Sequence, residues 1–142
     1  MATFKQINEQ IFLGPQPAQR DLKEAKALGI RTVIDLRMPA ESHTSNEEMA
    51  SNNDLGYVNI PVNKSALAAR QIDELERALA STPGPHLVHC ATGARAALLI
   101  KLSQARLERW TAEQTFEEAR RIGFNLEDSD NFAGFVRKIT AS

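Results

Sequence analysis

Two kinds of hydrophobic pattern alternate along the chain. Short segments that are apolar at nearly every position predict strands, and they cover residues 11–13, 32–36, 57–62 and 86–89. The segment 32–36 (TVIDL) is β-branched and nearly all apolar, which is typical of a strand covered on both faces of a sheet. The turn 14–17 (GPQP) follows the first strand and ends it.

Apolar residues spaced three or four positions apart predict helices between and after these strands. The predicted helices cover 18–28, 66–80, 94–107, 111–123 and 129–139. Gly29 and Gly123 are the expected C-terminal stops of two of them, and Thr111 with Gln114 forms a capping box. The segment 39–54 is polar and predicts a surface helix with loops.

Strands that alternate with helices predict the fold class: one α/β domain spanning residues 1–142, with a mostly parallel central sheet and helices on both faces. Functional sites of such sheets form beyond the carboxyl ends of the strands. The prediction therefore brings Asp35 and Arg37 to the same edge as Asn63, Lys64 and Cys90.

Composition narrows the possible partners. A net charge of −1 gives no reason to expect nucleic acid or an anionic membrane as a partner. The longest all-apolar run, 96–100, is too short to cross a bilayer, and the N-terminus shows no secretory signal pattern. A cytoplasmic location is therefore expected, and the sequence leaves the oligomeric state open.

The metal-binding residue types are sparse. One cysteine and three histidines make a poor zinc set, so neither a metal nor another cofactor is expected. His43 and Glu47 have helical i, i+4 spacing but no third ligand nearby, and a solvated pair is the simpler interpretation. His86 follows a Pro-Gly-Pro turn and is expected at the surface.

The candidate chemistry lies at residues 89–95 (HCATGAR), between a predicted strand and a predicted helix. Backbone N–H groups of such a loop point into one concavity, and the helix dipole adds positive potential. Gly93 permits a backbone conformation that a Cβ would obstruct, and Arg95 offers a planar fork for two oxygens of an oxyanion. The same field favours the thiolate form of Cys90 and makes it a candidate nucleophile.

The structural alternative is that Cys90 is a small buried hydrophobe and Arg95 an ordinary helix cation. The strand, glycine, arginine and helix coincide at this loop, and this coincidence favours a site. Arg37 is a possible accessory cation or a partner of Glu41, and Asn63 and Lys64 are possible accessory residues for an anionic substrate.

The motif H-C-x-x-G-x-R resembles the phosphate-binding loop of cysteine-dependent phosphatases of the tyrosine and dual-specificity group. Together with IFLGPQP (11–17), VIDLR (33–37) and YVNIPV (57–62), it resembles a bacterial phosphatase-like family that also forms the N-terminal part of beta-lactamase-hydrolase-like fusion proteins. The resemblance extends from about Ile7 to Gly123.

This resemblance implies a phosphoric monoester hydrolase that acts on phosphotyrosine, another phosphoprotein or a different phosphorylated substrate. It implies that Cys90 forms a phosphocysteine, that Arg95 clamps the phosphoryl group and that His89 braces the loop. The backbone N–H groups from Ala91 through Thr92, Gly93 and Ala94 to Arg95 would complete the cradle.

Three features depart from that group. Four residues separate Cys90 from Arg95 where five are typical, and Ala96 follows the arginine where a Ser or Thr hydroxyl usually assists release of the thiolate. The region after YVNIPV lacks the usual general-acid Asp, and no carboxylate follows before Asp73. Loss of a general acid costs about 10²–10⁴ in rate, so a slow phosphatase or one specialised for good leaving groups is expected.

Two alternatives stay open. A four-residue spacer also resembles the loops of rhodanese-like sulfurtransferases, in which Cys90 would hold a persulfide without any need for a general acid. DLRMPAE (35–41) resembles their early D-x-R…E, although their H-I-P-G-A-like and Gly-Gly stretches are missing here. The other alternative is an oxyanion-binding module with little turnover. For the phosphatase interpretation, Glu41 and Asp54 are two further candidates for the general acid.

Overall fold

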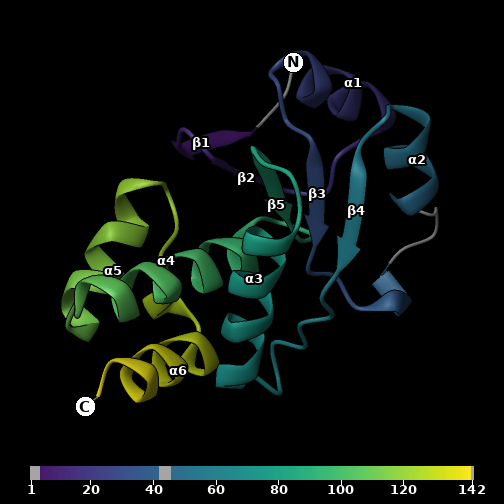
Figure 1. Cartoon of the computed structure of the whole chain (residues 1–142). Helices are drawn as coiled ribbons and strands as arrows, with labels where there is room; N and C mark the ends of the chain where they lie inside the picture. Colours follow the sequence, from purple (N-terminus) through teal and green to yellow (C-terminus); the bar gives the residue numbers. More distant parts are fainter. Residues whose placement is uncertain (1–3, 42–45, 142) are drawn as a thin grey trace.

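The computed structural model describes residues 4–41 and 46–141. The strands are β1 (Lys5–Asn8), β2 (Ile11–Gly14), β3 (Thr32–Asp35), β4 (Gly56–Asn59) and β5 (His86–His89). The helices are α1 (Gln19–Ala27), α2 (Asn46–Asn52), α3 (Ala69–Ser81), α4 (Ala94–Glu108), α5 (Ala112–Arg121) and α6 (Asp130–Thr140), with 3₁₀ turns η1 (Pro39–Glu41) and η2 (Leu126–Asp128). Figure 1 shows their arrangement along the chain.

The strands form one sheet in the order β1-β2-β5-β3-β4. Strands β2, β5, β3 and β4 are parallel, and β1 is an antiparallel edge strand on β2. The register aligns the last residues of the parallel strands in one row, which consists of Gly14, His89, Asp35 and Asn59. The predicted meeting of carboxyl ends at one edge is therefore confirmed.

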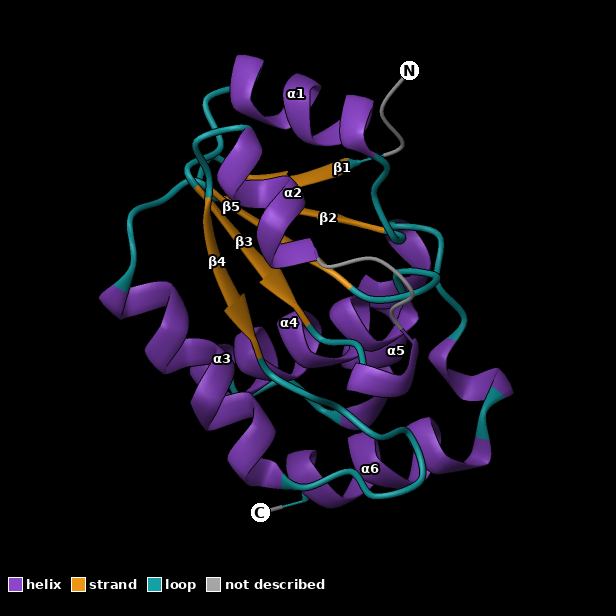
Figure 2. Ribbon diagram, turned by 90° about the vertical axis from the view of Figure 1, so that its right-hand side faces the viewer, coloured by secondary structure: helices purple, strands orange, loops and turns teal. Residues whose placement is uncertain are grey.

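Helices cover both faces of the sheet, as predicted (Figures 1 and 2). Val33 and Leu87 point to the face covered by α1 and α2, whereas Ile34 and Val88 belong to the larger core beneath α3 to α6. This alternation is the period of two that strands impose on side chains. The sheet thus has two separate cores, and the uniformly apolar strand sequences follow from burial on both faces.

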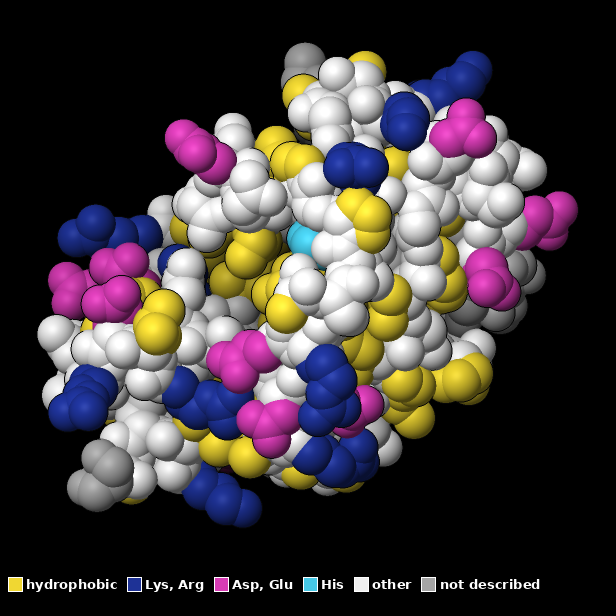
Figure 3. Space-filling model, viewed as in Figure 1, with side chains coloured by type: hydrophobic (Ala, Val, Ile, Leu, Met, Phe, Trp, Pro, Cys, Tyr) yellow, Lys and Arg dark blue, Asp and Glu magenta, His cyan; other side chains and the backbone are white. Residues whose placement is uncertain are grey.

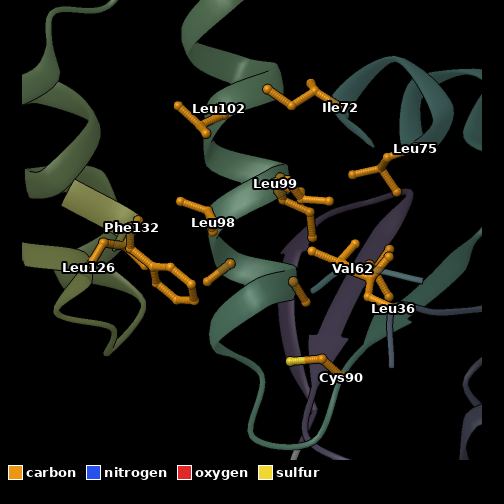
Figure 4. Packing of buried hydrophobic residues seen from close by; sticks show 14 of the residues in the cluster. Leu36, Val62, Ile72, Leu75, Cys90, Leu98, Leu99, Leu102, Leu126 and Phe132 are labelled. Carbon is orange, nitrogen blue, oxygen red and sulfur yellow. The ribbon is translucent and has the colours of Figure 1, made fainter. Parts of the chain in front are cut away.

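Helix α4 is the centre of the larger core. It is buried on several sides, because it packs against α3, α5, α6 and the sheet. Figure 4 shows its side chains Leu98, Leu99 and Leu102 among those of neighbouring elements, with Cys90 below them at the end of β5. The helix that follows the candidate loop is thus fixed by the main core of the protein.

Several sequence predictions need correction. β1 was not predicted, because Lys5–Asn8 lies at the sheet edge and only Ile7 is partly buried, which leaves no apolar pattern. The predicted strand 57–62 pairs only as far as Asn59, although Val62 N still donates to Leu36 O at 3.0 Å. The predicted helix 66–80 begins at Ala69.

Other predictions are confirmed or lie partly outside the structure. Thr111 and Gln114 form the reciprocal capping box, with distances of 2.8 and 3.1 Å. The polar segment 39–54 contains η1 and α2, and its residues 42–45, which include His43, lie outside the described residues.

His86 is buried, contrary to the surface position expected for it. It is only 3% exposed, because β5 is the middle strand of the sheet, and its Nε2 lies 2.8 Å from Thr82 Oγ1. Within the described part of the chain, no helix combines the length and apolar character that crossing a membrane requires.

Candidate active site

The candidate loop connects β5 to α4 at the carboxyl edge of the sheet. Cys90 directly follows β5, has no exposed surface and belongs to the larger core. Its Sγ accepts a hydrogen bond from Gly93 N at 3.0 Å, so the loop curls around the sulfur. The loop is also attached to the β2–α1 connection, because Gln16 N donates to Ala91 O at 3.1 Å.

Gly93 makes this curl possible. Its φ is +98°, a left-handed conformation that favours glycine, and it is the N-cap of α4. A Cβ at this position would lie 2.9 Å from Phe124 Cζ. Gly93 is therefore required by both the backbone conformation and the space around it, as the sequence predicted.

Arg95 lies in the first turn of α4 and is 8% exposed. Its Nη1 donates to Glu41 Oε2 at 2.8 Å and to Val62 O at 2.9 Å, and its Nη2 donates to Glu41 Oε1 at 2.6 Å. The hydrogen bonds from Arg95 hold the pKa of Glu41 at about 2. The guanidinium is thus oriented by two elements, and Nε takes no part in these bonds.

A second carboxylate–arginine pair lies deeper. Asp35 Oδ1 accepts from Arg37 Nε at 3.0 Å, and Asp35 Oδ2 accepts from Arg37 Nη2 at 3.0 Å and from Tyr57 Oη at 2.7 Å. Burial is the largest single influence and would raise the pKa of Asp35, but the hydrogen bonds from Arg37 and Tyr57 together with the electrostatic interaction with His89 outweigh it, and the pKa is lowered. The D-x-R sequence is therefore a buried ion pair at the end of β3.

His89 is packed between this pair and the loop. It is fully buried, its Nδ1 lies 3.3 Å from Cys90 O and its Nε2 lies 3.9 Å from Asp35 Oδ1. Burial lowers the pKa of His89 to about 4, so the ring is neutral at pH 7. This position fits the predicted role of a brace beneath the loop.

A cleft of about 370 Å³ opens above the loop. The residues that line it come from four parts of the chain and are Met38, Glu41, Asn63, Lys64, Ala91, Thr92, Ala94, Arg95, Ser129 and Phe132. Thr92 Oγ1 accepts from Ala94 N at 3.3 Å, which links the hydroxyl oxygen to the first residue of α4. The cleft is of a size that admits a phosphate or another small oxyanion together with part of its substituent.

The structure separates the predicted accessory residues. Asn63 and Lys64 line the cleft, whereas Arg37 is 1% exposed, pairs with Asp35 and does not line it. Asp73 pairs with Arg106 at 2.8 Å on the outer surface of α3, and Asp54 precedes β4 at the opposite edge of the sheet. Neither carboxylate reaches the loop.

Some lining residues gave no signal in the sequence. Ser129 and Phe132 come from the start of α6, which tertiary packing brings beside the loop. Glu41 was considered as a possible acid or as a partner of Arg37, and its contact with Arg95 depends on a separation of 54 residues that spacing cannot reveal. Among the described residues, no cluster of His, Cys, Asp or Glu could hold a metal ion.

The arrangement suits binding of an oxyanion beside a thiol. The N–H groups of the loop, the N-terminus of α4 and Arg95 supply positive potential around Cys90. Glu41 is the one carboxylate among the described residues that line the cleft, and Arg95 keeps it ionised. The site therefore places a thiol beside a guanidinium and backbone N–H groups, with no protonated carboxylic acid among those residues.

Two bacterial proteins with the same name are similar to this chain in sequence. The chain is 29% identical over 125 residues to a beta-lactamase hydrolase-like protein of Xylella fastidiosa (strain Temecula1) and 26% identical to one of Agrobacterium fabrum. Each match covers 84% of this chain and 29% of the relative, so the chain spans less than a third of those proteins.

Solved structures share the fold at lower identity. The Neisseria meningitidis protein nma1982 has a TM-score of 0.80 at 23% identity, covering 98% of this chain and 99% of its own. P. aeruginosa TpbA has a TM-score of 0.79 at 16% identity, covering 95% and 83%. These values confirm the phosphatase-like α/β fold.

A family model matches residues 3–107, which include every strand, the Cys90 loop and most of α4. The model describes the phosphatase-like domain of beta-lactamase hydrolase-like proteins. With the loop, the sheet edge and these matches in agreement, this chain belongs to the family of beta-lactamase hydrolase-like phosphatase domains.

Proposed function

We propose that this domain hydrolyses phosphate monoesters through a phosphocysteine formed on Cys90. The observation that carries the proposal is the loop itself, in which Sγ accepts from Gly93 N at 3.0 Å beside the oriented guanidinium of Arg95. Support also comes from relatives of the same fold: P. aeruginosa TpbA binds pTyr in one structure, and the PP-IP phosphatase SIW14 of S. cerevisiae binds citrate. Both ligands present oxyanions.

The first step transfers the phosphoryl group to sulfur. The Cys90 thiolate attacks phosphorus, an S–P bond forms, and the P–O bond to the leaving group breaks with its electron pair staying on oxygen. The N–H groups of the loop and the Nε–H of Arg95 stabilise the charge on the phosphoryl oxygens. Water then attacks phosphorus, the S–P bond breaks, and phosphate and the thiolate are released.

Among the described residues that line the cleft, no carboxylic acid is protonated at neutral pH, so the proposal takes the proton for the leaving oxygen from solvent. Glu41 cannot donate one at neutral pH, because Arg95 holds its pKa at about 2. This supports a preference for aryl phosphates and other substrates with good leaving groups over alkyl phosphates. We therefore propose phosphate monoesters with good leaving groups as the substrate class.

Sulfur transfer is the second candidate, and the missing acid favours it as well. In that reaction the Cys90 thiolate attacks the sulfane sulfur of thiosulfate, an S–S bond forms and sulfite leaves. Cyanide then takes the sulfur as thiocyanate and restores the thiolate, so no proton donor is needed. The four-residue spacer between Cys90 and Arg95 agrees with this chemistry.

A paired assay on the purified protein tests both phosphate monoester hydrolysis and sulfur transfer. One arm follows phenol release from an aryl phosphate, the other follows thiocyanate formation from thiosulfate and cyanide. We expect phosphate release that falls by more than about 10³-fold in Cys90→Ser and by a smaller factor in Arg95→Lys. Urea unfolding of each variant shows that the loss is chemical rather than structural.

Each other outcome has a definite meaning. Cys90-dependent thiocyanate without phosphate release would replace the phosphatase proposal with sulfur transfer. Phosphate binding without turnover in either arm would leave an oxyanion-binding module. Equal aryl phosphate turnover in wild type and Cys90→Ser would exclude Cys90 as the nucleophile.

A further inference from the structure

The cleft above the Cys90 loop adjoins a second hollow along helix α6. This hollow has a volume of about 300 Å³, and its lining includes Lys64, Leu67, Asn131, Phe135 and Lys138. Lys64 also lines the cleft itself, and α6 contributes residues to both, so the two hollows meet at this lysine. A ligand that holds its phosphate on the loop and extends along α6 therefore passes Lys64.

The backbone of Lys64 is held in place by its neighbours. Asn131 Nδ2 of α6 donates to Lys64 O at 3.1 Å, which ties α6 to the connection between β4 and α3. Figure 2 shows this connection running beside α6. Ser65 N donates to Asn63 Oδ1 and Ala66 N donates to Asn63 O, both at 2.9 Å, so the lysine lies in a defined turn. The fold thus fixes where the exposed side chain of Lys64 starts.

The ammonium groups of Lys64 and Lys138 are open to an anion. Both side chains are exposed, and within the part of the chain that the structure describes neither ammonium forms an ion pair or hydrogen bond. The carboxylates of the two linings are stabilised elsewhere. Glu41 accepts from Arg95, and Asp130 lies in the first turn of α6, where the helix dipole favours its charge. Three cations against two carboxylates leave an excess of positive charge.

A larger hollow elsewhere in the molecule differs in charge. It has a volume of about 830 Å³ between the β1–β2 hairpin and helices α3, α4 and α5, and hydrophobic side chains form much of it in Figure 3. Its charged lining residues are Glu76, Glu108 and Glu118 against Lys101. An anionic substrate is therefore attracted to the α6 side of the Cys90 cleft rather than to this hollow.

The lining of the hollow along α6 suits a peptide. Leu67 and Phe135 offer apolar contacts, and Asn131 and Lys64 offer polar ones, which matches the mixed character of a peptide chain. A small phosphate monoester would occupy the cleft alone. An extended peptide advances about 3.3–3.6 Å per residue, so residues next to a phosphorylated one can enter the adjoining hollow.

We propose that Lys64 selects phosphopeptides in which acidic residues flank the phosphorylated residue. This inference rests on the proposed function, because it places the phosphoryl group on the Cys90 loop beside Arg95. The flanking carboxylate accepts a charge-assisted hydrogen bond from Lys64 Nζ. Lys138 adds positive potential farther along α6.

Binding to Cys90→Ser tests the proposal without turnover. Two fluorescent peptides share a central phosphotyrosine and have either Glu or the isosteric Gln at the two positions on each side. Fluorescence anisotropy at low ionic strength gives both affinities. We expect the Glu peptide to bind roughly three- to tenfold more tightly, because each solvent-accessible charge pair changes affinity by up to about fivefold.

Variants of Lys64 in the same background assign this preference. Lys64→Met should lower the ratio of the two affinities at least about twofold, Lys64→Arg should retain the ratio, and Lys64→Glu should lower it further than Lys64→Met. Lys23→Met is the matched control, because Lys23 is an exposed lysine of α1 outside both linings, and it should leave the ratio unchanged. An unchanged ratio in Lys64→Met, equal affinities for the two peptides, or no binding of either would overturn the proposal.

An unphosphorylated Glu peptide checks that the phosphate is on the Cys90 loop. It should bind at least roughly tenfold more weakly than its phosphorylated form, because the charge-assisted hydrogen bonds of the phosphate are lost. Equal affinity of the two forms would place the peptide elsewhere and overturn the proposal.

Kinetics with Cys90 intact separate this proposal from the phosphatase proposal. Phosphate release from the two phosphopeptides gives kcat/KM, which should be higher for the Glu peptide by a factor similar to that in binding. Turnover of both peptides with equal kcat/KM and equal affinity would overturn the role of Lys64 alone. A preference in binding that depends on Lys64, without any turnover, would overturn the phosphatase proposal and support Lys64 as a recognition residue.

Discussion

Two carboxylate–arginine pairs lie at the same edge of the sheet and differ in their access to solvent. The side chains of Asp35 and Arg37 are 3% and 1% exposed, whereas those of Glu41 and Arg95 are 32% and 10% exposed. The first pair is enclosed beneath the loop, and the second lines the cleft. Two chemically similar pairs therefore have different physical roles.

The difference follows from desolvation. A buried pair has already lost its water, so removing one partner leaves an uncompensated charge. An ion pair with access to solvent contributes much less to the free energy of folding, because water and salt compete with it. The Asp35–Arg37 pair therefore contributes to stability, while Glu41–Arg95 can share its guanidinium with a bound oxyanion.

The largest expected effect is on the buried pair. Asp35→Asn should lower the free energy of unfolding by about 3–5 kcal/mol, because the buried Arg37 keeps its charge and loses the carboxylate that pairs with it at 3.0 Å. Urea denaturation at pH 7 measures it. In the matched variant Glu41→Gln the loss of unfolding free energy should be below about 1 kcal/mol. Equal losses in both variants would show that the two ion pairs do not differ in their contribution to stability.

The second prediction concerns pH and His89, which packs beside the buried pair. Its pKa is about 4 in the folded protein against 6.5 unfolded, so the unfolded chain takes up a proton first as pH falls. Stability should decline between pH 6.5 and 4, with His89 contributing at most roughly 3 kcal/mol of the loss.

Urea denaturation of wild type and His89→Asn across this pH range isolates the contribution. The variant should show a shallower decline, with the remainder coming from groups such as His86, whose pKa burial also lowers. Parallel curves for the two proteins would mean that His89 does not resist protonation in the folded state.

A glycine substitution tests the loop that separates the two pairs. Gly93→Ala should destabilise the protein by at least about 1–2 kcal/mol, since its φ is +98° and the new Cβ would meet Phe124. It should also reduce Cys90-dependent turnover. Gly134→Ala is the control, because a Cβ on this exposed position of α6 meets no atom within 4 Å.

Thermal unfolding of both glycine variants gives the comparison. The helical Gly134→Ala change should be neutral or stabilise by about 0.4–1 kcal/mol. A Gly93→Ala protein as stable and active as wild type would show that the loop does not depend on its left-handed residue.

The smallest effect on stability is expected at Glu41, together with a clear effect on activity. Glu41→Ala should cost below about 1 kcal/mol of unfolding free energy yet reduce kcat/KM by roughly 10- to 100-fold, because Arg95 loses the acceptor that orients it. Steady-state kinetics with an aryl phosphate measures this. Unchanged kinetics would assign the orientation of Arg95 to Val62 O alone.

Much of the fold could be predicted from the sequence, because burial of a strand or helix requires a regular pattern of hydrophobic residues. The two-sided burial of β3 and the helical spacing of α5 and α6 predicted those elements, and Thr111 with Gln114 predicted where α5 begins. β1 left no such pattern, because an edge strand exposes most of its side chains. His86 was misplaced because its burial depends on β5 being the middle strand.

For the candidate site, the sequence by itself determined the residues that must be neighbours along the chain. Cys90, Gly93 and Arg95 lie within one turn between a strand and a helix, so local conformation alone brings them together. Parallel pairing also allowed the common edge of Asp35, Asn63 and Cys90 to be predicted, because the carboxyl ends of parallel strands align.

Only the tertiary structure decided which partner each charge received. Arg37 pairs with Asp35 two residues away, whereas Arg95 reaches Glu41 54 residues away. The energetic contribution of each charge depends on its burial and on its distance from other charges, and both are set by how the helices pack on the sheet. Residue order fixes the chemical groups, while packing fixes their surroundings and hence their function.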